Sequence, residues 1–192
     1  MATENSADDD GGGTFIERAR RTQLIEVTIE LVADEGYRGA SLSAIAKRAG
    51  LSKAAVLYHF ASKDALVHAA HEHTLTELVA AVRRALEQAA PVDGPAAYVR
   101  AMIGHLREHP RHTRMLIEAM SNGFGEHGAA ERWQALAQIL DTAWPGRFAD
   151  SRTMAVIIGG GIDAIVNESL QDPGYDTAAA AEQLIAMIAA PN

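Results

Sequence analysis

Residues 41–60 read SLSAIAKRAGLSKAAVLYHF, and this stretch holds two short helical patterns separated by a glycine. Ser41 stands where a hydroxyl can accept a hydrogen bond from the free amides of a first helical turn, and Ser52 stands at the same place before the second pattern. Between them, Gly50 tolerates the left-handed backbone conformation in which many helices end. The spacing therefore predicts a helix-turn-helix that covers about residues 41–60.

The second helix of such a motif packs one face on its own core and offers the other to a DNA groove about 12 Å wide. We expect Val56, Leu57 and Phe60 to point inward, because they are spaced by one and three residues. Small side chains at positions 54 and 55 would let the backbone approach base edges, and their methyl groups suit contact with thymine. The outward face is then predicted to contain Lys53, Ala54, Ala55, Tyr58 and His59, with Lys53 and Tyr58 placed to meet phosphates.

The charge is unevenly distributed along the chain. The net charge is −8, yet the window from Gly36 to Lys63 contains no acidic residue. The basic residues of that window are Arg38, Lys47, Arg48, Lys53 and Lys63. From Asp64 onward, acidic residues outnumber basic ones. A basic N-terminal part on an acidic body is typical of a protein that presents one end to nucleic acid.

Composition excludes several classes of protein. The chain has 192 residues, of which 48% are hydrophobic, enough to fill one or two cores. It has no cysteine, which excludes disulfides, thiolate nucleophiles and cysteine-ligated metals. No apolar run approaches the ~18 to 20 residues that span a bilayer, and the acidic start differs from a signal peptide. We expect a cytoplasmic protein with no membrane partner and a disordered acidic tail, residues 1–13.

Helical periodicity continues through the rest of the chain, and no stretch alternates as a strand would. The expected helices cover residues 16–34, 42–49, 53–60, 63–90, 95–109, 111–120, 130–143, 152–170 and 177–190. The predicted fold class is all-α, in which a three-helix head is joined by a long fourth helix to a C-terminal helical bundle.

From Arg18 to Leu66 the chain resembles the TetR/AcrR family of bacterial transcriptional regulators, through EGYRGASLSAIAKRAG, LSKAAVLYHF and ASKDAL in that order. The resemblance implies a DNA-binding head, residues 14–66, and a ligand-binding and dimerisation body, residues 67–192. It implies phosphate contacts from Tyr58 and Lys63. It also places other residues on or near DNA, namely Ser43, Lys53, Ala54, Ala55 and His59. Many relatives carry a tyrosine at position 57, where this chain has Leu57, and we transfer its role to Tyr58.

The body contains residue types that are common in small-molecule sites. The candidate pocket residues are Tyr98, Met102, His105, Met115, Glu118, Phe124, Trp133, Leu136 and Trp144. Each is also an ordinary core residue, so plain packing is the alternative. Histidines cluster within residues 68–73 and 105–112, but no carboxylate accompanies them at matching spacing. No metal site and no cofactor is therefore predicted.

Three consecutive glycines, Gly159 to Gly161, interrupt an apolar helical pattern at a cost of roughly 1 kcal/mol each against alanine. Close approach of a neighbouring helix would offset that cost. In the resembled family the last two helices form a four-helix dimer interface, and a helix crossing within one subunit is the alternative. The predicted interface residues are Ile158, Gly161, Ile162, Ile165, Leu184, Met187 and Ile188.

These features together predict a homodimeric transcriptional regulator of palindromic double-stranded operator DNA, a repressor released by an unknown small-molecule effector. An activator or an effector-independent regulator of the same fold is one alternative, and a dimerisation module that binds DNA non-specifically is another. An enzyme is not expected. The sequence lacks a cysteine nucleophile, a phosphate-cradling glycine loop and any Ser-His-acid set that can be placed.

Overall fold

The structure is a computed structural model that describes residues 15–124 and 128–189, without the side chains of residues 128–131. The predicted disordered tail, residues 1–13, lies outside the described residues. The secondary structure of the described part is helical throughout, which confirms the predicted all-α class. Its elements are α1 (Phe15–Gly39), α2 (Leu42–Ala49), α3 (Lys53–His59), α4 (Lys63–Gln88), a 3-10 turn η1 (Pro91–Asp93), α5 (Gly94–Glu108), α6 (Pro110–Ser121), α7 (Gly128–Ala143), α8 (Ser151–Gln171) and α9 (Thr177–Ala189).

The first helix is longer than predicted and has a kink. We expected it to end at Asp34, whereas α1 continues to Gly39. Within it Gly36 has φ of 71° and ψ of 171°, a backbone conformation that residues with a Cβ rarely adopt. The kink brings Tyr37 to α6, where its amide donates a hydrogen bond to Glu118.

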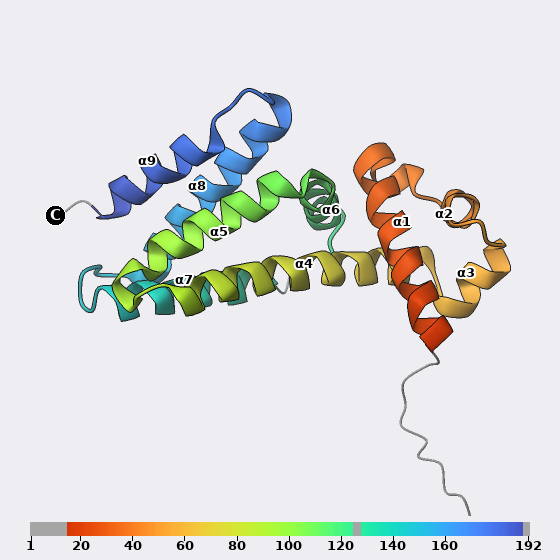
Figure 1. Ribbon diagram of the computed structural model, residues 1–192, viewed down its shortest axis with the longest axis horizontal. Coiled ribbons are helices and arrows are strands. Elements are labelled where there is room, and N and C mark those ends of the chain that lie inside the picture. The colour runs from red at the N-terminus through yellow and green to blue at the C-terminus, as the bar shows by residue number, and fades with distance from the viewer. Residues whose placement is uncertain (1–14, 125–127, 190–192) are drawn as a thin grey trace, which may run out of the picture.

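The helix α4 connects the two ends of the molecule. Figure 1 shows it as a long rod, with α1, α2 and α3 around its N-terminal end and α8 and α9 at the opposite end of the molecule. Ser62 caps α4, because its hydroxyl accepts a hydrogen bond from the Ala65 amide at 3.0 Å. The position of α4 therefore links the orientation of the head to the packing of the body.

Two apolar cores lie along this rod. The core of the head buries Leu24, Ile45 and Val56, and it also receives Met115 and Ala119 from α6. The core of the body is centred on residues of α5, α7 and α8, and α4 contributes to both cores. Although α6 belongs to the predicted body by sequence, it packs into the core of the head.

The helix α8 is long and apolar enough to cross a membrane by length and composition. This corrects the expectation that no apolar run approaches that length. A helix in a protein core meets the same criteria, and α8 buries Ala155, Ile158 and Ile162 in the body. Its contacts with α5, α7 and α9 bury one face of α8, and 28% of its apolar window is buried.

Candidate nucleic-acid interface

The helix-turn-helix is built from two serine caps and one glycine. The Ser41 hydroxyl accepts a hydrogen bond from the Ala44 amide at 3.1 Å, and the Ser52 hydroxyl accepts one from the Ala55 amide at 3.1 Å. Gly50 takes the left-handed conformation, with φ of 67° and ψ of 31°. Each cap satisfies an amide that has no partner inside its helix. The turn and the start of α3 are therefore set by residues next to one another in sequence.

The helix α3 presents one face to the core and another to solvent. Val56 is 0% exposed and Phe60 is 4% exposed, whereas Lys53 and Ala54 are exposed. Leu57 is 42% exposed, so the prediction that it points inward is wrong. In so short a helix the inward stripe holds positions four apart, and position 57 is turned by ~100° from position 56. The outward face therefore includes Leu57.

Tyr58 is 74% exposed, and its contacts place it at the meeting of α1 and α3. Its hydroxyl donates a hydrogen bond to Glu17 Oε1 at 3.2 Å. Its ring lies edge-on to the His59 ring, with 5.0 Å between the centroids. A phosphate that accepts from the Tyr58 hydroxyl must therefore replace the Glu17 carboxylate.

Arg21 was not among the predicted site residues. The basic run at residues 18–21 could have indicated it, because basic residues near a helix-turn-helix are common at a DNA surface. Its guanidinium donates to the carbonyl of His59 and lies over the Phe60 ring, 4.2 Å from the centroid. Carbonyls at the C-terminal end of a helix carry partial negative charge, so a cation there stabilises the helix. Arg21 thus holds the end of α3 against α1.

Lys63 is attached to the end of α1. Its ammonium donates to the Tyr37 carbonyl and lies 3.7 Å from the centroid of the Tyr37 ring. The Tyr37 hydroxyl donates to Asp64, and this hydrogen bond raises the pKa of Tyr37. Burial lowers the pKa of Lys63, and the Asp64 carboxylate opposes that effect. The cation therefore sits in a defined position at the first turn of α4, whose free amides also favour anions.

The predicted DNA-contact residues lie on α2, α3 and the first turn of α4. Of these, Ser43, Lys53, Ala54 and Tyr58 are exposed, and Ala55, His59 and Lys63 are half-buried.

Residues 24–70 match the bacterial regulatory proteins of the tetR family. The chain is 38% identical over 84 residues to the HTH-type transcriptional regulator BetI of Burkholderia thailandensis, and the match covers 44% of this chain and 42% of that protein. It is 39% identical over 84 residues to the HTH-type transcriptional regulator BetI 1 of Chromohalobacter salexigens, covering 44% of this chain and 41% of that protein. The chain thus matches less than half the length of these curated relatives.

Solved structures extend the likeness in fold over most of the chain. A TetR-like transcriptional regulator from Rhodococcus sp. RHA1 has a TM-score of 0.75 at 21% identity, covering 87% of this chain and 92% of that chain. A putative transcriptional regulator from Pseudomonas aeruginosa PAO1 has a TM-score of 0.78 at 22% identity, covering 89% of each chain. Residues 24–70 are thus similar to the tetR family, and the solved structures show that the likeness in fold covers most of the chain. The curated relatives that match the N-terminal segment are named as transcriptional regulators.

The predicted pocket residues are divided between separate environments. The body core contains Tyr98, Met102, Leu136 and Trp144, and the head core contains Met115 and Phe124. The His105 ring lies 4.4 Å from the His109 ring between centroids, in a tilted arrangement, and Glu118 accepts a hydrogen bond from Tyr37. Six of the nine predicted residues therefore lie in or against two different cores, so the structure does not bring all nine to one cavity.

Two clefts lie elsewhere on the tetR-family fold. One has a volume of about 180 Å³ and lies between α1, α6 and α8. The other has a volume of about 460 Å³ and lies beside η1, between the C-terminal end of α4 and α7. Of the nine predicted pocket residues, only Glu118 lines either cleft.

The predicted dimer residues also fall into different environments. Ile158 and Ile162 are 0% exposed and Ile188 is 7% exposed within one protomer, so these three are corrected to core residues. Gly161, Ile165 and Leu184 are half-buried, and Met187 is 70% exposed. The exposed apolar residues of α8 are instead Val156 and Ile157, at 45% and 59%.

The three glycines of α8 have three different surroundings. A Cβ on Gly159 would lie 1.8 Å from the Trp133 ring, and a Cβ on Gly161 would lie 3.3 Å from Leu184. A Cβ on Gly160 would meet nothing within 4 Å. Crossings inside one protomer therefore account for Gly159 and Gly161, and only Gly160 has open space before it.

In the structure, the carboxylate of Glu77 lies beside two histidines of the body. Glu77 Oε2 lies 3.3 Å from His112 Nδ1, and Glu77 Oε1 lies 3.6 Å from His73 Nε2. Even so, no group of three or more such side chains within residues 15–124 and 132–189 could hold a metal ion. Burial lowers the pKa of His105 and of His112, which favours their neutral forms.

Proposed function

We propose that the protein is a dimeric, sequence-specific DNA-binding transcriptional regulator of the cytoplasm, a repressor that a small-molecule effector releases from a palindromic operator. The observation that carries this proposal is the capped helix α3, whose exposed face lies inside the segment that matches the tetR family. The relatives that match the same segment are named as transcriptional regulators.

The proposed DNA contacts divide into reading and positioning. Ala54 and Ala55 keep side chains short on the outward face of α3, so that its backbone approaches base edges and thymine methyl groups. Lys53, Tyr58 and Lys63 hold phosphates, which fixes the register without reading sequence. Ser43 and His59 complete the proposed surface at its edges.

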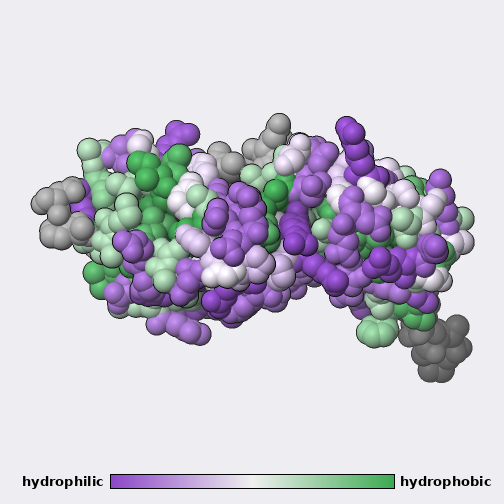
Figure 2. All heavy atoms as spheres, turned by 90° about the horizontal axis from the view of Figure 1, so that it is seen from above, coloured by the Kyte–Doolittle hydropathy of each residue, from purple (hydrophilic) through white to green (hydrophobic). Residues whose placement is uncertain are grey.

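The proposed dimer uses the exposed face of α8 and α9. Val156, Ile157 and Met187 are exposed apolar residues of these helices, and Gly160 leaves room for another helix to approach. Figure 2 shows hydrophobic side chains gathered at the end of the molecule that carries α8 and α9. Two copies bound to a palindromic operator must place their α3 helices in half-sites ~34 Å apart.

The proposed effector acts by favouring one arrangement of α4 and α6 over another. Both helices contact α1, so a shift of either changes the orientation of the head. The effector releases DNA only to the extent that its affinity differs between the two arrangements.

A mobility-shift titration with a fragment from the chain's own upstream region tests the proposal. We expect the fragment to shift, and we expect excess unlabelled fragment, but not excess unrelated DNA, to compete. Equal competition by both DNAs would reject sequence-specific binding and favour a module that binds DNA non-specifically. An activator or an effector-independent regulator of the same fold is the alternative, and transcription in vitro from the bound promoter separates these from a repressor.

A further inference from the structure

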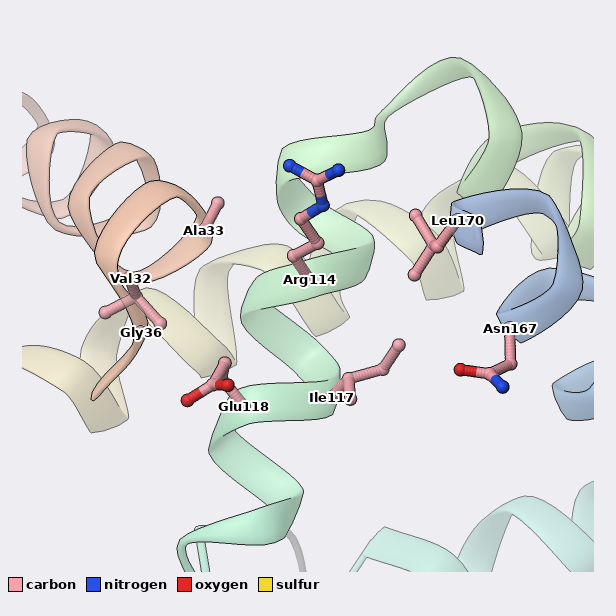
Figure 3. Close-up of a pocket in the computed structure, with 8 residues that line it drawn as sticks. All are labelled: Val32, Ala33, Gly36, Arg114, Ile117, Glu118, Asn167 and Leu170. Carbon is pink, nitrogen blue, oxygen red and sulfur yellow. The ribbon is translucent and has the colours of Figure 1, made fainter. Parts of the chain in front are cut away.

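The cleft of about 180 Å³ lies where the head and the body face each other across α6, and we call it the junction cleft (Figure 3). Figure 3 shows α6 between α1 on one side and the C-terminal end of α8 on the other. Its lining residues are Val32, Ala33 and Gly36 of α1, Arg114, Ile117 and Glu118 of α6, and Asn167 and Leu170 of α8. A ligand in this cleft would touch both halves of the molecule.

The junction cleft carries one charge of each sign, and both come from α6. Arg114 is exposed, and no described residue forms an ion pair or hydrogen bond with its guanidinium. Glu118 follows one helical turn later, on the same face of α6. Its Oε2 accepts a hydrogen bond from the Tyr37 amide at 3.0 Å, and its Oε1 is left for another donor.

The rest of the junction cleft is small and mixed in character. Asn167 supplies an amide from α8, while Ile117 and Leu170 supply apolar surface, with Ile117 39% exposed. The volume of the junction cleft, about 180 Å³, equals that of about six water molecules in the liquid. The cleft therefore has room for a small metabolite with a short apolar part.

We propose that the junction cleft binds a small zwitterion, such as a free aliphatic amino acid, with the ligand carboxylate on Arg114 and its ammonium on Glu118. This inference rests on the proposed function, since it names the class of the effector. A guanidinium binds a carboxylate through two parallel hydrogen bonds, and the free Oε1 of Glu118 accepts from an ammonium. A simple anion or a simple cation would leave one of the two charges unmatched, which disfavours both.

Glu118 also begins a series of contacts that reaches the DNA surface. It holds the amide of Tyr37, and the carbonyl and ring of Tyr37 hold the ammonium of Lys63. A ligand ammonium on Oε1 draws negative charge away from the carboxylate that also holds the Tyr37 amide through Oε2, which weakens that hydrogen bond. Occupation of the cleft thus loosens Tyr37 and removes the support that positions Lys63 for phosphate.

Calorimetric titration of the full chain with L-leucine tests the site directly. Two matched probes separate the charges: L-leucinamide lacks the carboxylate, and 4-methylpentanoate lacks the ammonium. We expect L-leucine to bind at least tenfold more tightly than either. Arg114→Gln should remove the preference over L-leucinamide, and Glu118→Gln should remove the preference over 4-methylpentanoate.

Arg111→Gln is the matched control, because it removes the same charge from the same helix outside the cleft. Arg111 faces Glu30 and Asp34, at 3.7 Å and 3.9 Å. We expect this variant to bind L-leucine like the wild type. The proposal is overturned if L-leucine does not bind the wild type, or if Arg114→Gln and Arg111→Gln bind it equally.

The coupling to DNA is measured by fluorescence anisotropy of a labelled upstream fragment with and without L-leucine. We expect L-leucine to weaken DNA binding by the wild type at least tenfold. In Tyr37→Leu, which keeps the amide but loses the ring, L-leucine should still bind while its effect on DNA falls below twofold. An unchanged effect would contradict the role of Tyr37. Absence of DNA binding by the wild type would contradict the proposed function, and calorimetry would still decide the fate of the cleft.

Discussion

The Lys63 ammonium lies 3.7 Å from the centre of the Tyr37 ring and donates one hydrogen bond to the Tyr37 carbonyl. An ammonium has three donors, so two remain for a phosphate. A flexible lysine side chain is thereby held near one position before DNA arrives, which lowers the conformational entropy lost on binding. The same pair joins the start of α4 to the end of α1, so the position of the cation depends on both helices.

Lys63→Ala should weaken binding to every DNA sequence and reduce the salt dependence of the affinity. Each phosphate contact that is lost lowers the slope of log affinity against log salt by ~0.9. Anisotropy titrations at several salt concentrations measure both effects. Lys47→Ala removes the same charge from an exposed position on α2 and serves as the control. Equal loss in both variants would mean that only net charge matters.

Ala55→Leu should damage specific binding far more than non-specific binding. Position 55 is half-buried at the start of α3, where a longer side chain would hold the backbone away from the base edges. Mobility shifts with the upstream fragment and with unrelated DNA measure the ratio of the two affinities. Unchanged specific affinity in a variant that melts like the wild type would refute our placement of the base-reading face.

Gly159→Ala and Gly160→Ala should change stability in opposite directions. The first places a methyl group 1.8 Å from the Trp133 ring, and overpacking of this kind costs about 1–3 kcal/mol. The second meets nothing within 4 Å and gains up to about 1 kcal/mol of helix propensity. Urea unfolding measures both at a concentration where the oligomeric state is the same. A stability loss in both variants would show that the partner helix also needs position 160 bare.

Ile157→Glu should separate the proposed dimer into monomers. Ile157 is 59% exposed on α8, and a carboxylate there would be desolvated by a partner helix. Light scattering after size exclusion gives the mass of the wild type and of the variant. Val79→Glu is the control, because Val79 is 56% exposed on α4, away from the proposed face. A variant mass equal to that of a dimeric wild type would argue for another interface.

Acidification should destabilise the fold through the histidines at the α5–α6 junction. Burial is the largest cause that lowers the pKa of His105 and of His112. Neighbouring histidines lower both further, and Glu77 opposes the effect. The unfolded chain binds these protons more readily than the folded chain does. The two neutral histidines therefore give their full stabilisation above the unfolded histidine pKa of about 6.5, and this stabilisation is lost as the pH falls below it.

Melting temperatures between about pH 7.5 and pH 5.5 test this sign, since carboxylates titrate mainly below that range. Replacing His105 and His112 together by glutamine should flatten the dependence. His68→Gln changes an exposed histidine of α4 and should leave it as in the wild type. A wild-type pH dependence in the double variant would assign the effect to other groups.

Local features of the head could be predicted because they depend on near neighbours in sequence. Ser41 and Ser52 cap helices by accepting hydrogen bonds from amides that lie three residues further on, and Gly50 supplies its own left-handed backbone. The resemblance of residues 18–66 likewise rests on a contiguous pattern. The placement of Leu57 could not be predicted in this way, since both sides of a short apolar helix look alike until its neighbours are known.

The all-α class, the helix-turn-helix and the likeness to the tetR family could be read from the amino-acid sequence, because capping, turn conformation and helical period act over a few residues. The packing of the helices then sets which apolar residues are buried and which are exposed. It buried Ile158 while leaving Ile157 exposed, and it took Met115 into the core of the head. It also brought Glu118, Tyr37 and Lys63 together from three helices. Such choices depend on side chains far apart in sequence, whose contacts form only when the helices pack.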